Sequence, residues 1–195
     1  MIDRTPQGNR TPFAWLFKAI GLPGLARSVG SSIPAIQQGQ ASSNRFLLQV
    51  VQPGLVGLID GTISTLAPVF ASAYIAGSRA ALLVGLAAAF GAAISMGLSE
   101  GLSDDGQLTG RGSSLVRGLI TGTATFVGGT FHTLPFLARD VHTALLIAYA
   151  VVAVELVAIA WVRRRFLAVS LSRSLAQVTM GGIMVAAVGV AVGHA

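Results

Sequence analysis

Residues 46–195 consist of five long apolar segments separated by short polar connections, at about 46–74, 80–99, 115–138, 141–162 and 174–193. Each segment is close to or longer than the ~20 residues that a helix needs to cross the ~30 Å hydrocarbon core of a bilayer. Lipid offers the backbone no hydrogen-bond partners, so spanning segments must be helical or form a closed barrel. The alternating pattern of barrel strands is missing. The sequence therefore predicts an all-α membrane protein with five transmembrane helices, multi-pass and in contact with membrane lipid.

The composition excludes other classes of protein. Only 10% of the residues are charged and 53% are hydrophobic, whereas soluble proteins carry roughly 25% charged residues. The net charge of +6 comes from arginines between apolar runs and not from a continuous patch, so we expect no nucleic-acid partner. The motifs of phosphate-binding loops, zinc proteases and serine hydrolases are missing. We therefore expect a protein that is not an enzyme and holds no permanent cofactor.

The basic residues divide unequally between the two ends of the predicted helices. One side carries Arg4, Arg10, Lys18, Arg27, Arg45, Arg111, Arg117, Arg163, Arg164, Arg165 and Arg173, and the other carries Arg79 and Arg139. Basic residues concentrate on the cytoplasmic side of membrane proteins. This predicts a cytoplasmic N-terminus and, with five spans, an outside C-terminus. The use of Arg over Lys, with much Ala, Gly and Val, suggests a bacterial inner membrane.

Residues 1–45 form a polar N-terminal arm rich in proline. Within it, Phe13, Leu16, Phe17 and Ile20 have the spacing of one helix face. The spacing predicts an interfacial helix at 13–20, lying on the membrane. The alternative is a loosely packed tail in which the periodicity arises by chance.

Four pairs of glycines lie four residues apart in the apolar segments: Gly57 and Gly61, Gly97 and Gly101, Gly118 and Gly122, Gly189 and Gly193. Such pairs let helix backbones approach closely. They favour either a homodimer or tight packing within one protomer.

Asp60 lies in the middle of the first segment, which also contains Pro53 and Pro68. At 29 residues that segment would be roughly 44 Å long, so it either projects from the bilayer or is kinked. A carboxylate at this depth costs ~2.5–3.5 kcal/mol to insert and usually marks an ion or proton pathway. With Gln49, Pro53, Val56 and Ser64 it forms a polar stripe that lines a cavity or holds helices together. As an alternative, a protonated Asp60 would hydrogen-bond to a neighbouring helix and serve packing alone.

Met96 and Glu100 lie one turn apart at the end of the second segment. A thioether with a carboxylate suits a divalent transition metal better than Ca²⁺ or Mg²⁺. Taken alone, Met96 is more typical of packing, and Glu100 is either a functional carboxylate or a solvated cap. Asp104 and Asp105 follow, either as an acidic mouth that attracts cations or as an exposed loop.

Glu155 and His132 are two further titratable groups in the apolar segments. Glu155 either takes part in proton transfer or pairs toward the arginines that begin at Arg163. His132 either receives a departing cation or proton, or is a hydrogen-bonded histidine at the membrane interface.

Two stretches resemble helices 1 and 2 of the vacuolar iron transporter family: Gly57–Ser64 with its Asp60-Gly61, and Gly91–Glu100, which reads GAAISMGLSE. The resemblance covers about residues 46–195, including Leu134-Pro135 near the end of helix 3. The stretch Leu102–Gly112 resembles the bacterial branch whose members are called membrane-bound ferritin.

The resemblance implies a dimeric, proton-coupled exporter of Fe²⁺, and also of Mn²⁺ or Co²⁺, with a pathway at the dimer interface lined by helices 1 and 2. Asp60 and Met96 match the membrane metal ligands of the family, and Glu100 matches the acidic residue of the same motif. The metal site expected from the sequence comprises Asp60, Met96, Glu100, Asp104 and Asp105.

Two departures from the family pattern concern how metal is collected. The connection at 101–114 is too short for the Glu-rich cytoplasmic domain of the plant and yeast members, and residues 1–45 lack the Glu-x-x-His pairs of a ferritin-like domain. We therefore expect no ferroxidase activity. The alternative function is a membrane scaffold that transports nothing and recruits a partner through its N-terminal arm.

Overall fold

The computed structural model describes residues 44–106 and 109–195, and every regular element in them is a helix. In chain order these are η1 (Leu47–Val51), α3 (Gln52–Ser64), α4 (Leu66–Ser103), α5 (Ser114–Phe131), η2 (Leu134–Leu137), α6 (Val141–Leu167) and α7 (Leu171–Gly193). The prediction of an all-α protein is confirmed for these residues. The interfacial helix expected at 13–20 lies outside them.

Three continuous helical stretches are long and apolar enough to cross a membrane: Asn44–Ser103 with 60 residues, Val141–Leu167 with 27 and Leu171–Gly193 with 23. The chain thus has the character of a membrane protein. The 18-residue helix α5 is not among the three, so five spans remain a prediction. A straight helix of 60 residues would be roughly 90 Å long, about three times the hydrocarbon thickness.

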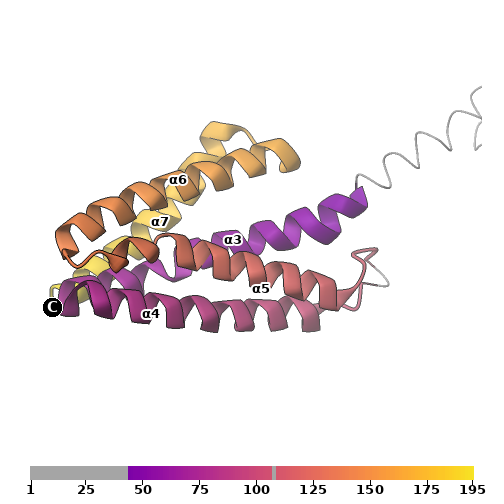
Figure 1. The fold of residues 1–195 in the computed structure, drawn as a ribbon. Coiled ribbons are helices and arrows are strands. Elements are labelled where there is room, and N and C mark those ends of the chain that lie inside the picture. The colour runs from indigo at the N-terminus through magenta and orange to yellow at the C-terminus, as the bar shows by residue number, and fades with distance from the viewer. Residues whose placement is uncertain (1–43, 107–108) are drawn as a thin grey trace, which may run out of the picture. The chain divides into compact units, whose positions relative to one another are not determined.

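The longest stretch does not run straight, because the chain reverses at Gly77. Gly77 has φ 78° and ψ −173° inside α4, a conformation that is open essentially to glycine alone. After the reversal, Gly85 lies against Val69. One turn further on, Ala89 and Thr65 both lie against Gly129 of α5. Residues 47–76 and 78–103 therefore form two antiparallel arms (Figure 1). These arms correspond to the first and second apolar segments of the sequence.

The two prolines of the first arm explain its irregularities. The π-helical turn η1 ends just before Pro53, and α3 is separated from α4 at Thr65 (φ −87°, ψ −12°). Pro68 has no N–H to give to the carbonyl four residues earlier, which weakens the helix at this point. The first arm is thus broken at Thr65, as the kinked alternative predicted.

The four glycine pairs pack inside the protomer. Gly57 and Gly61 contact the backbone of α5, Gly97 and Gly101 face the pair on α5, and Gly189 and Gly193 lie against α4. A Cβ on Gly97 would come within 3.0 Å of the Gly118 carbonyl oxygen. The glycine pairs therefore serve tight packing within one protomer, and their spacing no longer argues for a homodimer.

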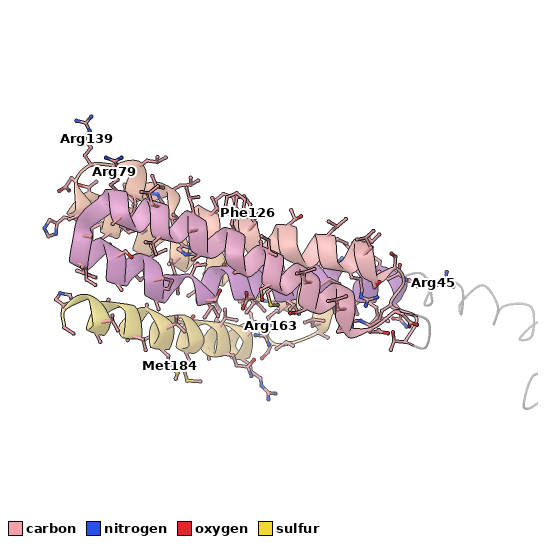
Figure 2. The ribbon with its side chains drawn as sticks, turned by 90° about the horizontal axis from the view of Figure 1, so that it is seen from below. Arg45, Arg79, Phe126, Arg139, Arg163 and Met184 are labelled. Atoms are coloured by element: carbon pink, nitrogen blue, oxygen red, sulfur yellow. The ribbon has the colours of Figure 1, made fainter. Side chains whose placement is uncertain are left out.

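Helix α5 lies between the two arms, while α6 and α7 cover the first arm (Figure 1). The main hydrophobic core forms where the end of the first arm meets α6, α7 and η2, around Leu66, Phe70, Phe136 and Ile159. Arg79 and Arg139 lie at the end of the bundle with the Gly77 reversal, and Arg45 lies at the opposite end (Figure 2).

Candidate functional site

Asp60 lies on an outward-facing part of α3. Its side chain is half-buried and interacts with Ser64, one turn further along the helix. Ser64 is exposed, and Val56, one turn earlier, is 46% exposed. Other parts of the protein contact the predicted polar stripe only at its N-terminal end. There Pro53 is buried, and Gln49 donates a hydrogen bond to the Gly110 carbonyl at 3.2 Å. Asp60 is therefore partly accessible on the surface of the protomer.

Asp60, Met96 and Glu100 share one face of the layer formed by α3, α5 and the second arm of α4. Each directly precedes a glycine that packs on α5, namely Gly61, Gly97 and Gly101. One residue corresponds to a rotation of about 100° around a helix axis. Because the two arms are antiparallel and both contact α5, the same rotation turns all three side chains toward the same side of the layer. The predicted ligands from two helices therefore face one way.

One protomer does not enclose these side chains in a metal site. In the described part of the chain, no three His, Asp or Glu side chains are grouped so that they could hold a metal ion. Three cavities that the structure describes are lined by other residues, between α4 and α5, between α3 and α6, and between α3 and α5. The face with Asp60 and Met96 is open on the protomer.

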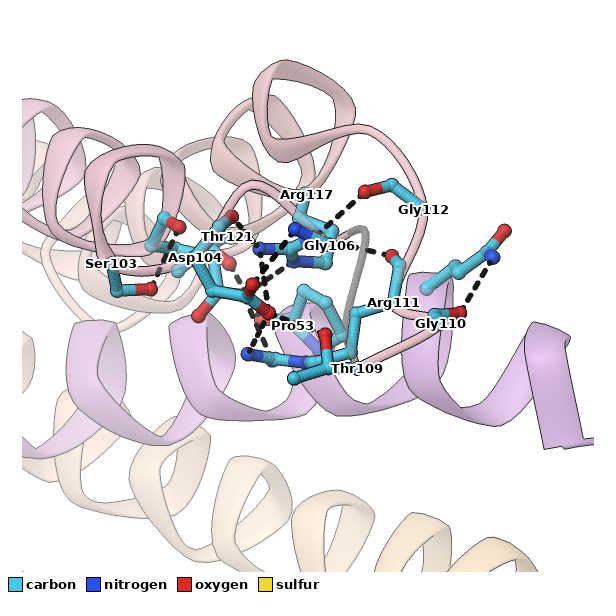
Figure 3. Close-up of polar contacts among 12 residues, drawn as sticks. Pro53, Ser103, Asp104, Gly106, Thr109, Gly110, Arg111, Gly112, Arg117 and Thr121 are labelled. Atoms are coloured by element: carbon cyan, nitrogen blue, oxygen red, sulfur yellow. Dashed lines mark hydrogen bonds and ion pairs between the residues drawn. The ribbon is translucent and has the colours of Figure 1, made fainter.

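Glu100 belongs to an ion-pair cluster with Arg111 and Arg117 that sequence reasoning missed; Figure 3 shows the two arginines. The Arg117 side chain is completely buried, and its Nε donates to Glu100 Oε1 at 2.8 Å. Its terminal nitrogens donate to the carbonyls of Asp104 at 2.7 Å, Gly112 at 3.0 Å and Arg111 at 3.2 Å. A buried guanidinium is tolerated only when it is paired and hydrogen-bonded in this way. From the sequence alone, Arg117 is only one of the basic residues that orient the helices. Its position three residues after the start of an apolar helix is the feature that indicates a structural role.

The same cluster ties down the connection between α4 and α5. Arg111 gives Glu100 Oε1 a second donor at 2.8 Å. Asp104 accepts from the Thr109 hydroxyl at 2.6 Å and from the Gly106 amide at 2.8 Å. These two hydrogen bonds, the Thr109 bond foremost, hold the pKa of Asp104 below its ordinary value of 3.8. Glu100 is therefore neither a solvated cap nor a free ligand, and Asp104 stabilises a loop.

Asp105 is exposed at this end of the bundle. No contact described here tests the expected cation-attracting role of Asp104 and Asp105, which stays a prediction. In the same way, the metal-binding roles of Asp60, Met96 and Glu100 remain predictions from the sequence and the family resemblance.

A second cluster joins three helices inside the apolar core. His132 is fully buried, and its Nδ1 lies 3.0 Å from Glu155 Oε2. Its Nε2 lies 2.8 Å from Oγ1 of Thr65, at the break in the first arm. Of the two alternatives for His132, these contacts fit the hydrogen-bonded histidine, which the bundle encloses. Glu155 does not pair toward the arginines either, since Arg163 donates to Gln177 at 3.0 Å.

Comparison of the chain with protein-family models, with curated proteins and with solved structures found no match. We therefore infer the function from the residues themselves and from the family resemblance of the sequence.

Proposed function

We propose that the protein exports a divalent transition metal, foremost Fe²⁺ and also Mn²⁺ or Co²⁺, from the cytoplasm in exchange for protons. One observation carries this proposal. Asp60 is a half-buried carboxylate in a long apolar helix, and it shares its outward face with the thioether of Met96. An intramembrane carboxylate is expensive and is by default a functional residue.

The ligand chemistry favours two copies of the chain. One protomer supplies one carboxylate and one thioether on the open face, which is too few for a divalent ion. A two-fold contact between two such faces would supply two of each, a mixed set that suits Fe²⁺ and its neighbours better than Mg²⁺. The proposed unit is therefore a homodimer with the pathway between the first and second arms of its copies.

The transport cycle follows from the positions of the acidic groups. The cation enters past Glu100, Asp104 and Asp105, and it exchanges water for Asp60 and Met96 at the membrane centre. Protonation of Asp60 then weakens the site and releases the metal. Since Glu100 already has two arginine partners, the principal ligands in this proposal are Asp60 and Met96.

The arginines support the orientation that this cycle needs. The cytoplasmic end would be the one with the 104–113 connection and the arginines that flank it, and the outer end the one with Arg79 and Arg139 (Figure 2). In a bacterium the host membrane would be the inner membrane. Export then runs from the acidic connection toward the Gly77 end.

The test is metal flux into proteoliposomes that contain a metal-sensitive dye and a pH dye. Wild-type protein should move Fe²⁺ and protons in opposite directions. Asp60→Ala should abolish both signals, and Asp60→Asn should do the same because its amide cannot exchange a metal for a proton.

Met180→Ala serves as the matched control for Met96→Ala, since Met180 is a 63% exposed methionine on α7. Met180→Ala should leave flux unchanged while Met96→Ala reduces it. No flux above empty liposomes from folded wild-type protein, with Mn²⁺ and Co²⁺ also tried, would refute transport and favour the scaffold.

A further inference from the structure

We propose that His132 and Glu155 form a second proton-binding site besides Asp60, and that Thr65 connects this site to the helix that carries Asp60. The proposal rests on the proposed exchange of metal for protons and adds a place where a further proton is held. The observation that supports it is a row of hydrogen bonds that joins α6, the end of α5 and the break between α3 and α4.

The row is continuous from Glu155 to α3. Glu155 Oε2 lies 3.0 Å from Nδ1 of His132, and Nε2 of the same ring lies 2.8 Å from the Thr65 hydroxyl. That hydroxyl donates to the Gly61 carbonyl at 2.8 Å. Gly61 follows Asp60 directly in the chain. The row therefore joins Glu155 to the backbone of the residue that follows Asp60.

Counting hydrogens shows how many protons this arrangement holds. Thr65 has one hydroxyl hydrogen and gives it to Gly61, so Nε2 of His132 must carry a hydrogen and donate it to Thr65. A second hydrogen must lie between Nδ1 and Glu155 Oε2. The pair therefore holds two hydrogens, either as an imidazolium with a carboxylate or as a neutral imidazole with a carboxylic acid, and it is neutral as a unit.

Loss of one proton reverses one hydrogen bond and breaks another. When the pair gives one proton to a water molecule, the remaining hydrogen on Nδ1 donates to the Glu155 carboxylate, and Nε2 becomes an acceptor. The Thr65 hydroxyl then donates to Nε2 and no longer to Gly61. The pair gains one negative charge, and the Gly61 carbonyl loses its side-chain donor. This exchange takes place at the break in the first arm, where Pro68 has already weakened the helix.

The second observation is an unpartnered oxygen beside a cavity. Glu155 Oε1 is buried and has no hydrogen-bond partner among the described residues, and the side chain as a whole is only 9% exposed. Glu155 also lines a cavity of about 480 Å³ whose other walls are apolar side chains such as Leu58, Phe131 and Val154. A buried polar oxygen without a partner is expensive. The carbon atoms of Glu155 line this cavity, whereas Oε1 itself is covered by the protein.

The other titratable groups of the surrounding elements do not compete for this role. In the central parts of the packed helices these are Asp60 on α3, Tyr74 on α4 and Tyr149 on α6. The hydroxyls of Tyr74 and Tyr149 lie 3.1 Å apart and pair with each other, and Asp60 interacts with Ser64. Helix α7 carries no charged or titratable side chain from Ser174 to Gly193. Thr65 is thus the polar group that faces the pair from the first arm.

The first test detects the proton directly and requires no transport. Infrared difference spectra of the full chain in lipid are recorded over about pH 4 to 9, a range that includes the ordinary titration of histidine. We expect a titrating carboxyl C=O band that Glu155→Gln removes and Asp60→Asn retains. A spectrum unchanged by Glu155→Gln, or no titrating band in that range, would overturn the proposal.

The second test asks whether the pair couples to metal. In proteoliposomes with both dyes, Glu155→Gln and Thr65→Val should move fewer protons per metal ion than wild type, while metal flux continues. Thr65→Ser keeps the hydroxyl and should keep the coupling. Wild-type proton-to-metal ratios in Glu155→Gln would contradict the proposal.

If wild-type protein moves no metal, the transport function fails, and the infrared result alone decides the proton site. Thermal unfolding of each variant in detergent separates a lost proton site from a misfolded protein. Glu155→Gln and Thr65→Val preserve side-chain size, so both should fold.

Discussion

Arg117 donates from Nε to Glu100 Oε1 at 2.8 Å, and this contact joins the start of α5 to the end of α4. The guanidinium is fully buried and the Glu100 side chain is 13% exposed. The same arginine also binds three backbone carbonyls of the 104–112 connection. One side chain thus connects the start of α5 to the end of α4 and to three carbonyls of the connection between them.

Removal of Arg117 should destabilise the protein strongly. Arg117→Ala leaves Glu100 as a buried charge with one remaining partner, and breaking a buried pair costs roughly 3–5 kcal/mol. The control is Arg139→Ala at an exposed position, which should change little. Denaturant unfolding in detergent micelles measures both. Adding Glu100→Gln to Arg117→Ala should recover part of the loss, and additive effects of the two changes would argue against a direct pair.

The connection between α4 and α5 should loosen in acid. The Thr109 and Gly106 hydrogen bonds lower the pKa of Asp104 from 3.8, so its ionised form stabilises the folded loop. This contribution is complete above the ordinary pKa and is lost as the pH falls through the lowered one.

Hydrogen exchange at the Gly106 amide, compared between neutral pH and about pH 3, would measure this effect after correction for intrinsic rates. Asp104→Asn should have rapid exchange at both values. A protection factor in wild type that is independent of pH would contradict the assignment. Asp140→Asn, which removes a carboxylate at the start of α6, should retain the wild-type pH dependence at Gly106.

Close packing of α3 on α5 should make Gly61 intolerant of any side chain. A Cβ at Gly61 would collide with the backbone of Thr125, whereas a Cβ at Gly91 would meet nothing within 4 Å. We expect Gly61→Ala to cost about 1–3 kcal/mol through overpacking. Gly91→Ala should be neutral or stabilising by up to about 1 kcal/mol, because alanine favours a helix more than glycine. Equal melting temperatures of the two variants would show that α3 and α5 do not pack as described.

The sequence was sufficient to predict the helices but not their polar partners. The apolar runs and Pro68 determine where the first arm is helical and where it breaks, because these effects are local. The contact between Thr65 and His132 spans 67 positions in the chain. It depends on how three helices rotate against each other, which hydrophobic periodicity does not specify at such low polarity.

The glycine pairs illustrate the same limit. Their spacing indicated close helix contacts, and those contacts are present. Whether the partner helix belongs to the same chain could not be read from spacing, since a neighbouring copy offers the same backbone. Likewise, the packing of Gly61 and Gly97 on α5 determines which way Asp60 and Met96 face. The sequence alone does not specify this packing.

The proposed thioether ligand should affect which metals bind. Met96→Leu keeps the size and apolar character of the side chain and removes only the sulfur, so the fold should tolerate it. We expect Fe²⁺ and Co²⁺ affinity in detergent to fall by at least the roughly tenfold that loss of an outer-shell partner costs. Mn²⁺, which relies more on oxygen ligands, should be affected less.

Met180→Leu on the exposed side of α7 is the matched control and should bind as wild type. Equal losses for Fe²⁺ and Mn²⁺ in Met96→Leu would mean that the side chain acts through packing. An unchanged affinity for both metals, in a variant whose melting temperature equals that of wild type, would remove Met96 from the site and leave Asp60 to be tested alone. Because the thioether is the only soft ligand proposed, the ratio of the two affinities is the quantity that decides.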